Sequence, residues 1–231
     1  MQPLKKFYEE NLYPLQDGIL NCVKNLNLPF YLTGGTALSR GYFNHRYSDD
    51  IDLFTNSNPD FKSHSDAIVL TLKNNTYAID TSTMILSQDY VSFYVSCEGL
   101  SNIQCKLDLV NDKAPHFGII QPTPVYYKTD DWYNILINKF TALFRLEIKD
   151  FVDIWIIAKN KKFNWDDIIT KGREKELGLD AIVCAHLMKT ISFELLPTIK
   201  WAIDVSFDEF LKDMDTIAID LLKGCDNSLV T

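Results

Sequence analysis

Two aspartates, Asp50 and Asp52, stand two residues apart in a segment of alternating polar and apolar residues. This alternation predicts a strand, in which residues two apart project from the same face. Two adjacent carboxylates repel each other unless a cation lies between them, and oxygen-only ligands favour Mg²⁺ or Mn²⁺. We therefore predict that Asp50 and Asp52 bind metal, against the alternative of a solvated aspartate pair at a strand end. Ile51 and Leu53 should point into the core, and Asp49 away from the pair.

Ahead of these aspartates, Gly34-Gly35-Thr36 lies between a predicted strand, Phe30–Thr33, and a predicted helix that begins at Thr36. Glycines there let the backbone approach a phosphate, and the start of a helix supplies N–H donors and a positive dipole. We predict that Gly34 and Gly35 contact phosphates and that the Thr36 hydroxyl adds a further contact. The alternative is a plain turn in which Thr36 caps the helix.

A third carboxylate, Asp108, lies in the otherwise apolar run Lys106-Leu107-Asp108-Leu109-Val110, which predicts a later strand. If this strand lies beside that of Asp52, Asp108 completes a carboxylate triad. Its predicted role is second-metal ligand and base for an acceptor hydroxyl. The alternative is an exposed strand aspartate.

Together these residues resemble the nucleotidyltransferase superfamily of the DNA polymerase β type. The hallmark of that superfamily is a Gly-Gly or Gly-Ser turn, a short helix, Asp-x-Asp on a strand and a third carboxylate on a later strand. Residues 32–38 (Leu-Thr-Gly-Gly-Thr-Ala-Leu) and 45–54 (His-Arg-Tyr-Ser-Asp-Asp-Ile-Asp-Leu-Phe) are more specifically similar to the AbiEii/AbiGii toxin family. Its members are nucleotidyltransferase toxins of abortive-infection and toxin–antitoxin systems.

That family also carries a helical Lys-x-x-Ala-x-x-x-Arg followed by Arg-Asp-x-x-Asp. Here Lys139 begins the first pattern, Arg145 stands one residue short, and Lys149 replaces the arginine before Asp150 and Asp153. The resemblance implies that Lys139 contacts the triphosphate and that Asp150 or Asp153 lines the same cleft. The alternative is that these charges form surface or interhelical ion pairs of little energetic weight.

Two further sets of cations bear on phosphate binding. Arg46, just before the aspartate strand, is expected to steady a phosphate or to brace the carboxylates. A modest basic cluster is usually a solvated face, but this one is also the only sequence hint of an RNA acceptor. It comprises Lys159, Lys161, Lys162, Lys171, Arg173 and Lys175.

The composition narrows the class of protein. The 231 residues carry a formal net charge of -8, which argues against a general electrostatic nucleic-acid binder. The five scattered cysteines have no metal-ligand spacing and are expected to be reduced thiols. The N-terminal residues do not resemble a signal peptide, and no apolar run approaches the roughly 20 residues of a membrane span. We expect a cytoplasmic, bacterial protein that does not enter membranes.

The pattern of residues predicts an α+β fold with two domains. An N-terminal mixed β-sheet flanked by helices, of the nucleotidyltransferase type that the resemblance implies, should occupy residues 1–127, and a C-terminal helical bundle residues 128–231. In the first domain we expect helices over 3–26, with a break at Pro14, 36–43 and 61–74, and strands over 30–33, 50–55, 77–86, 90–97 and 103–110. The last three strands should form a meander. In the second domain we expect helices over 132–146, 150–159, 165–176, 179–193 and 207–222.

The resemblance implies a metal-dependent nucleotidyltransferase that moves a nucleoside monophosphate from an NTP to an acceptor, either tRNA or another RNA, or a protein. It also implies a toxin whose partner is an antitoxin protein. Two alternatives stay open: a catalytically silent nucleotide-binding regulator, and an adenylyltransferase that acts on a small molecule. The identity of the nucleotide is open as well.

Overall fold

The structure, a computed structural model, describes residues 2–97 and 103–230. It divides into two compact units, which we describe separately: Met1–Lys113 with Ile119–Asp130, and Ala114–Gly118 with Asp131–Thr231. The predicted domain boundary after residue 127 stays a prediction. No helix among the described residues is long and apolar enough to cross a lipid bilayer. All five cysteines are free.

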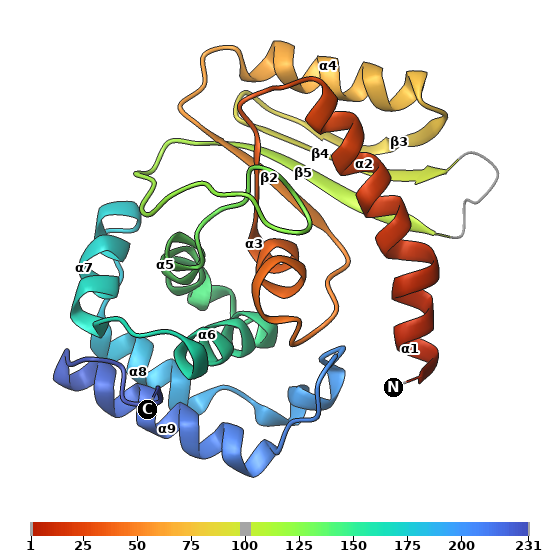
Figure 1. The fold of residues 1–231 in the computed structure, drawn as a ribbon. Helices are drawn as coiled ribbons and strands as arrows, with labels where there is room; N and C mark the ends of the chain where they lie inside the picture. The colour runs from red at the N-terminus through yellow and green to blue at the C-terminus, as the bar shows by residue number, and fades with distance from the viewer. Residues whose placement is uncertain (1, 98–102, 231) are drawn as a thin grey trace. The chain divides into compact units, whose positions relative to one another are not determined.

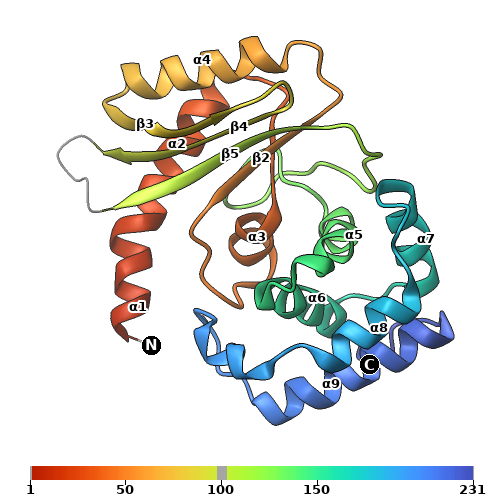
Figure 2. The ribbon, with the colours of Figure 1, turned by 180° about the vertical axis from the view of Figure 1, so that it is seen from behind.

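The first unit is built on a mixed sheet of five strands within the described residues, in the order β1-β2-β5-β4-β3 (Figures 1 and 2). The strands are β1 Tyr31–Thr33, β2 Ile51–Asn56, β3 Tyr77–Leu86, β4 Tyr90–Cys97 and β5 Gln104–Asp112. β2 and β5 are parallel, and the other neighbours are antiparallel. The predicted meander of β3, β4 and β5 is confirmed. With the flanking helices, the sheet confirms the predicted α+β class.

One face of this sheet is apolar. Phe93 of β4, Leu107 of β5 and Ile51 of β2 occupy neighbouring register positions on it and are almost fully buried. The amphipathic helix α4, Phe61–Asn74, runs along the sheet beside β3 (Figure 1) and buries Ile68 and Leu72. The opposite face is therefore the one on which polar strand residues can gather.

The N-terminal helical run continues through the position where a break was predicted. It consists of α1 Gln2–Phe7, a π-helical turn at Tyr8–Leu12, and α2 Tyr13–Asn25. Pro14 lacks the N–H that would bond to the carbonyl four residues earlier, and the wider π turn directly before it accommodates that loss. A second helical run after β1 consists of α3 Gly34–Thr36 and a π-helical turn at Ala37–Phe43.

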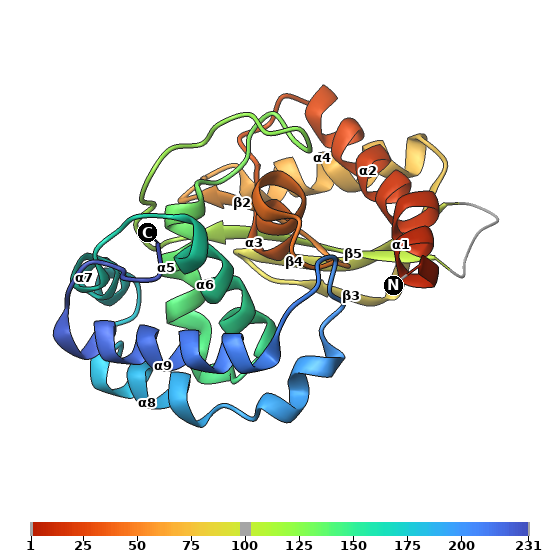
Figure 3. The ribbon, with the colours of Figure 1, turned by 60° about the horizontal axis from the view of Figure 1, so that its bottom comes forward.

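Helices dominate the second unit, as predicted. They are α5 Trp132–Ala142, a 3-10 turn at Leu143–Arg145, α6 Ile148–Asn160, α7 Trp165–Lys175, α8 Ala181–Thr190, a 3-10 turn at Phe193–Thr198, and α9 Phe207–Lys223. Side-chain caps set several starts: Asp131, Asn164, Asp180 and Ser206 accept from the first backbone N–H groups of α5, α7, α8 and α9. The α-helix predicted over 132–146 ends at Ala142 and continues as the 3-10 turn, which ends at Arg145 because Leu146 adopts a left-handed conformation. α8 and α9 lie side by side (Figure 3).

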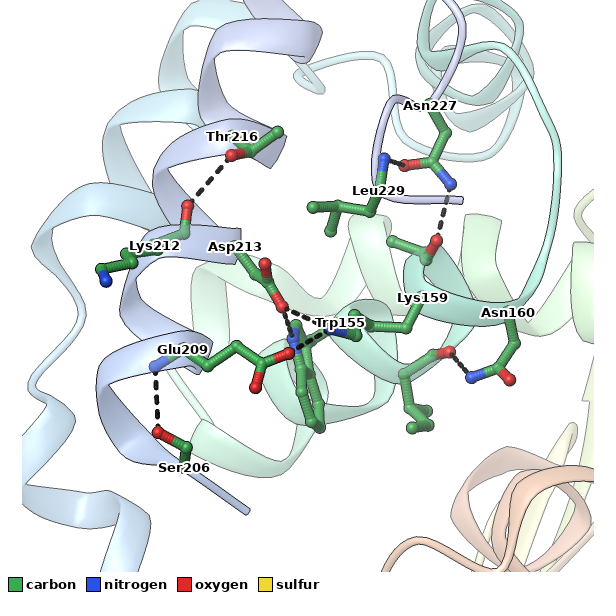
Figure 4. A network of polar contacts seen from close by, with 12 residues as sticks. Trp155, Lys159, Asn160, Ser206, Glu209, Lys212, Asp213, Thr216, Asn227 and Leu229 are labelled. Carbon is green, nitrogen blue, oxygen red and sulfur yellow. Dashed lines mark hydrogen bonds and ion pairs between the residues drawn. The ribbon is translucent and has the colours of Figure 1, made fainter. Parts of the chain in front are cut away.

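A polar network joins α6 to α9 in this unit (Figure 4). The Trp155 indole N–H donates to Asp213 at 2.8 Å, and the Lys159 ammonium contacts Asp213 at 3.1 Å and Glu209 at 2.5 Å. The Trp155 ring also packs against Phe210, with ring centroids 5.2 Å apart. Asp213 thus satisfies a tryptophan N–H and an ammonium group on the neighbouring helix at once.

We expect Asp213→Ala to lower the free energy of unfolding by about 1–3 kcal/mol, because it leaves the Trp155 N–H without its acceptor in a part-buried position. Urea unfolding followed by circular dichroism measures the change. The matched control is Asp215→Ala on the same helix. That carboxylate is 64% exposed, and its ion pair with Lys189, at 3.6 Å, is long and solvated. The control should stay within about 0.5 kcal/mol of the wild type. Equal losses in both variants would contradict the structural role of Asp213.

Candidate active site

A row of polar residues crosses the sheet on the face opposite the apolar core. Thr33 of β1 is the register partner of Asp52 on β2, Asp52 is that of Asp108 on β5, and Asp108 is that of Ser92 on β4. Register partners share a face and neighbouring strands lie about 4.8 Å apart, so the two aspartates stand side by side. The condition placed on Asp108, that its strand adjoin that of Asp52, is confirmed.

The predicted alternation along β2 is also confirmed on its apolar side. Ile51 and Leu53 are fully buried. Asp50 lies directly ahead of the strand, two residues before Asp52. Asp49 is held elsewhere, because its carboxylate accepts a hydrogen bond from the hydroxyl of Tyr8 in the N-terminal helical run.

Asp108 is oriented by three donors. It accepts from the Ser92 hydroxyl at 2.6 Å and the Tyr90 hydroxyl at 3.1 Å, and its second oxygen lies 2.7 Å from the Lys106 ammonium. Burial disfavours the charged form of Lys106, but the hydrogen bond and charge of Asp108 outweigh this effect and raise the lysine pKa above its usual value. Lys106 therefore stays charged across the physiological pH range and supplies a fixed positive charge beside Asp108.

The glycine turn approaches this row closely. Gly34 adopts a left-handed backbone with φ of 67°, and a Cβ on it would collide with the Asp52 carboxylate. A Cβ on Gly35 would lie 3.2 Å from the Ser48 hydroxyl and still closer to the Arg46 guanidinium. The two glycines thus allow a carboxylate and a buried arginine to pack against the backbone of the turn. The phosphate contacts predicted for Gly34, Gly35 and Arg46 stay predictions.

Thr36 is fully buried, and its hydroxyl donates to the backbone carbonyl of Asp50. In this arrangement the side chain ties the helix after the glycine turn to the residue ahead of β2. It does not cap the helix, since the structure gives α3 no side-chain cap at its start. The phosphate contact predicted for Thr36 stays a prediction.

The ligand types at the site fit a divalent metal in part. Asp50, Asp52 and Asp108 offer only carboxylate oxygens, which suit Mg²⁺ or Mn²⁺. Within residues 2–97 and 103–230, however, no group of three or more acidic, histidine or cysteine side chains is gathered closely enough to hold a metal ion. The metal-binding role predicted for Asp50 and Asp52 stays a prediction. A metal at Asp108 would have to displace the Lys106 ammonium from one carboxylate oxygen.

In the second unit, Lys139 lies at the centre of a buried ionic cluster. Its ammonium contacts Asp150 at 2.6 Å and Asp153 at 2.7 Å, and both carboxylates are fully buried. Asp150 also accepts from Arg145 at 3.1 Å. The alternative drawn from the sequence, interhelical ion pairs, is therefore present between α5 and α6, but the pairs are buried instead of exposed. Burial makes each partner costly to remove.

Some residues at the sheet site were not identified from the sequence. Lys106 could have been identified from the sequence, because it stands two residues before Asp108 on the same strand and therefore projects from the same face. Tyr90 and Ser92 reach Asp108 from β4, and only the strand pairing reveals that contact. Asp130 is fully buried and accepts from the Thr33 hydroxyl at 2.6 Å, which adds a carboxylate beside the polar row.

Comparison with known proteins relates this arrangement to a family. The model of the family described as Nucleotidyl transferase AbiEii toxin, Type IV TA system, matches residues 19–175. No curated protein matches the chain. Among solved structures, JHP933 from Helicobacter pylori is 17% identical, with a TM-score of 0.62 over 92% of this chain and 93% of its own. MenT4, a nucleotidyltransferase toxin from Mycobacterium tuberculosis, is 14% identical, with a TM-score of 0.54 over 90% of this chain and 83% of its own. At these identities the two structures support the fold alone.

We expect Gly34→Ala to destabilise the protein by at least about 1 kcal/mol, because alanine is strained at positive φ and its methyl group would collide with Asp52. Chemical unfolding provides the measurement. Gly178→Ala is the control, since a Cβ there would make only an ordinary contact with Glu176 at 3.6 Å. An unchanged stability of Gly34→Ala would show that the close approach of the turn to Asp52 is not maintained in solution.

We expect Lys139→Met to cost about 3–5 kcal/mol of unfolding free energy, because it leaves two buried carboxylates without their shared cation. The control Lys149→Met removes a cation that is 48% exposed and 4.0 Å from Glu147. Equal stability of Lys139→Met and Lys149→Met would contradict the buried cluster.

Proposed function

We propose that this chain, which belongs to the AbiEii family of nucleotidyl transferase toxins, transfers a nucleoside monophosphate from an NTP to an acceptor. The observation that carries the proposal is the position of Asp52, between the Gly34 turn and the register-paired Asp108. A backbone turn against a carboxylate pair can receive a triphosphate and its bound cation, because carboxylates hold the metal and N–H groups face the phosphates.

In the proposed reaction, Asp50 and Asp52 hold Mg²⁺ or Mn²⁺, which when bound would neutralise charge on the phosphates. Gly34, Gly35 and Thr36, with Arg46, bind phosphate oxygens of the NTP. Asp108 faces the acceptor and takes its hydroxyl proton as the acceptor oxygen bonds to the α-phosphorus of the NTP. The bond from that phosphorus to the leaving pyrophosphate breaks in the same transfer. The donors from Ser92, Tyr90 and Lys106 support the role of Asp108, because they fix the orientation of its carboxylate.

Lys139 and Asp150 complete the set of residues that we propose for function. The triphosphate contact of Lys139 stays a prediction beside its buried ion pairs. Lys139→Arg separates the two roles better than removal of the charge, because arginine keeps a cation between Asp150 and Asp153 but changes its shape and donor geometry. A stable Lys139→Arg protein with weakened NTP binding would support the predicted contact.

For the acceptor we propose tRNA or another RNA, or a protein, and for the partner an antitoxin. The basic cluster of the second unit gives RNA limited support, because many of its charges are already engaged. Lys159 contacts Glu209 and Asp213 (Figure 4), Lys171 contacts Asp167 at 3.1 Å, and Arg173 lies 3.7 Å from Asp180. Incubation with labelled NTPs and total RNA, and separately with lysate protein, distinguishes the acceptor classes.

We expect Asp52→Ala to abolish NTP-dependent transfer and to leave the fold intact, because the carboxylate lies on the polar face of the sheet and not in its core. Transfer of label from each of the four NTPs, measured with Mg²⁺ or Mn²⁺, tests this. Asp66→Ala, at an exposed carboxylate on α4, is the control and should retain activity. Retained transfer activity in Asp52→Ala would contradict the assignment of the site.

Two other functions are separated by the same assays. A catalytically silent regulator would bind NTP and Mg²⁺ in isothermal titration and give no product with any acceptor. An adenylyltransferase of small molecules would label neither RNA nor protein but would consume ATP in the presence of a low-molecular-weight extract. The polar row with its oriented Asp108 favours transfer over silent binding, since a binding site does not need a positioned base.

A further inference from the structure

Three consecutive backbone carbonyls directly ahead of β2, those of Ser48, Asp49 and Asp50, accept hydrogen bonds from buried side chains. The Gln16 amide of α2 donates to the Ser48 carbonyl at 3.1 Å and to the Asp49 carbonyl at 3.0 Å. The Thr36 hydroxyl donates to the Asp50 carbonyl. Both side chains are fully buried. The backbone that leads into the aspartate pair is therefore held by donors from other elements before the strand ladder begins.

The orientation of the Gln16 amide is fixed by its other neighbour. Arg40 donates to the Gln16 side-chain oxygen at 3.1 Å, and Arg40 is itself anchored on Asp17 at 2.7 Å. A guanidinium group has donors only, so the atom that faces it must be the amide oxygen. The amide nitrogen therefore faces the backbone and donates to the two carbonyls.

We propose that Gln16 is a positioning residue for Asp50 and Asp52. It is far from them in sequence, and its contacts are to the preceding backbone and not to the carboxylates. By fixing two successive peptide units it limits the directions in which the next residues can point. This inference rests on the proposed nucleotidyl transfer, since the quantity that Gln16 controls is the geometry of the two aspartates in that reaction.

The test compares Gln16→Met and Gln16→Glu with the wild-type chain. Methionine has a similar length and no donor. Glutamate keeps the shape and the acceptor for Arg40 but replaces the donating nitrogen with an oxygen. We expect each variant to lower kcat by roughly tenfold to a hundredfold, as a small misplacement of reacting groups does, while KM for the NTP changes little. The assays are run well below the melting temperature of each variant. If Gln16→Met does not fold, the kcat of Gln16→Glu alone decides the outcome.

Asp17→Asn is the matched control. It weakens the surface anchor of Arg40, whose partner carboxylate is 56% exposed, and leaves the Gln16 donors in place, so kcat should be unchanged. An unchanged kcat in both folded Gln16 variants would overturn the proposal. So would a rise in KM at constant kcat, because that result would give Gln16 a role in substrate binding.

Amide hydrogen exchange provides a readout without turnover. In the Gln16 variants we expect faster exchange in peptides that cover residues 45–53, and no change in peptides from β4. Uniformly faster exchange, or none, would overturn the positioning role. If the wild-type chain transfers no nucleotide from any NTP, the proposed function fails, whereas the exchange result still decides whether Gln16 holds the aspartate segment.

Discussion

The parallel pairing of β2 with β5 is the constraint on which the site depends. It sets Asp52 opposite Asp108, although 56 residues separate them, and sets Ile51 and Leu53 opposite leucines on the other face. Side chains alternate along a strand, so a slip of β2 by one residue would turn Asp52 into the apolar core and expose Ile51 and Leu53. The hydrophobic effect that packs the core face therefore also fixes the register of the carboxylates. Stability and the geometry of the site come from the same pairing.

The carboxylates of this acidic protein are accommodated in two different ways. On the sheet, Asp108 lies at the edge of solvent and is held by a lysine and two hydroxyl groups. Between α5 and α6, Asp150 and Asp153 are withdrawn from water and share Lys139. A partly solvated ion pair costs less to separate than a buried one. Asp108 is therefore the more adaptable group.

Much of the architecture could be predicted from local patterns. The helix over 61–74 and the strands over 77–86 and 90–97 have the predicted bounds. Alternation and helical periodicity report on burial within one element, and burial is what the fold satisfies. The bounds of α5 and α8 were less well predicted. Side-chain caps and residues with a left-handed backbone set where such helical runs begin and end, and helical periodicity does not reveal them. The candidate residues of the sheet site were found as short local groups, but their arrangement was not.

What the sequence could not supply is the set of contacts between elements. In the sequence, Gln16 is one polar position on an amphipathic helix. Nothing near it in the chain indicates that its amide donates to the carbonyls ahead of the aspartates. Tyr90 and Ser92 likewise gain their significance only from the pairing of β4 with β5. These residues act on groups that are distant in sequence through one or two hydrogen bonds each. Short sequence patterns identify the groups that can react, whereas the residues that hold them in place are identified only by the fold.

The sheet site and the buried ionic cluster around Lys139 also differ in what a loss of activity in a variant would show. On the sheet, Asp52 can lose its carboxylate while the apolar face of β2 keeps the strand in register, so loss of transfer there reports on chemistry. At Lys139, the same charge that would meet a triphosphate neutralises two buried carboxylates, so loss of transfer confounds binding with stability. A role in the reaction is therefore best established first at Asp52 and Asp108. At Lys139 it requires variants that keep a positive charge between the two aspartates.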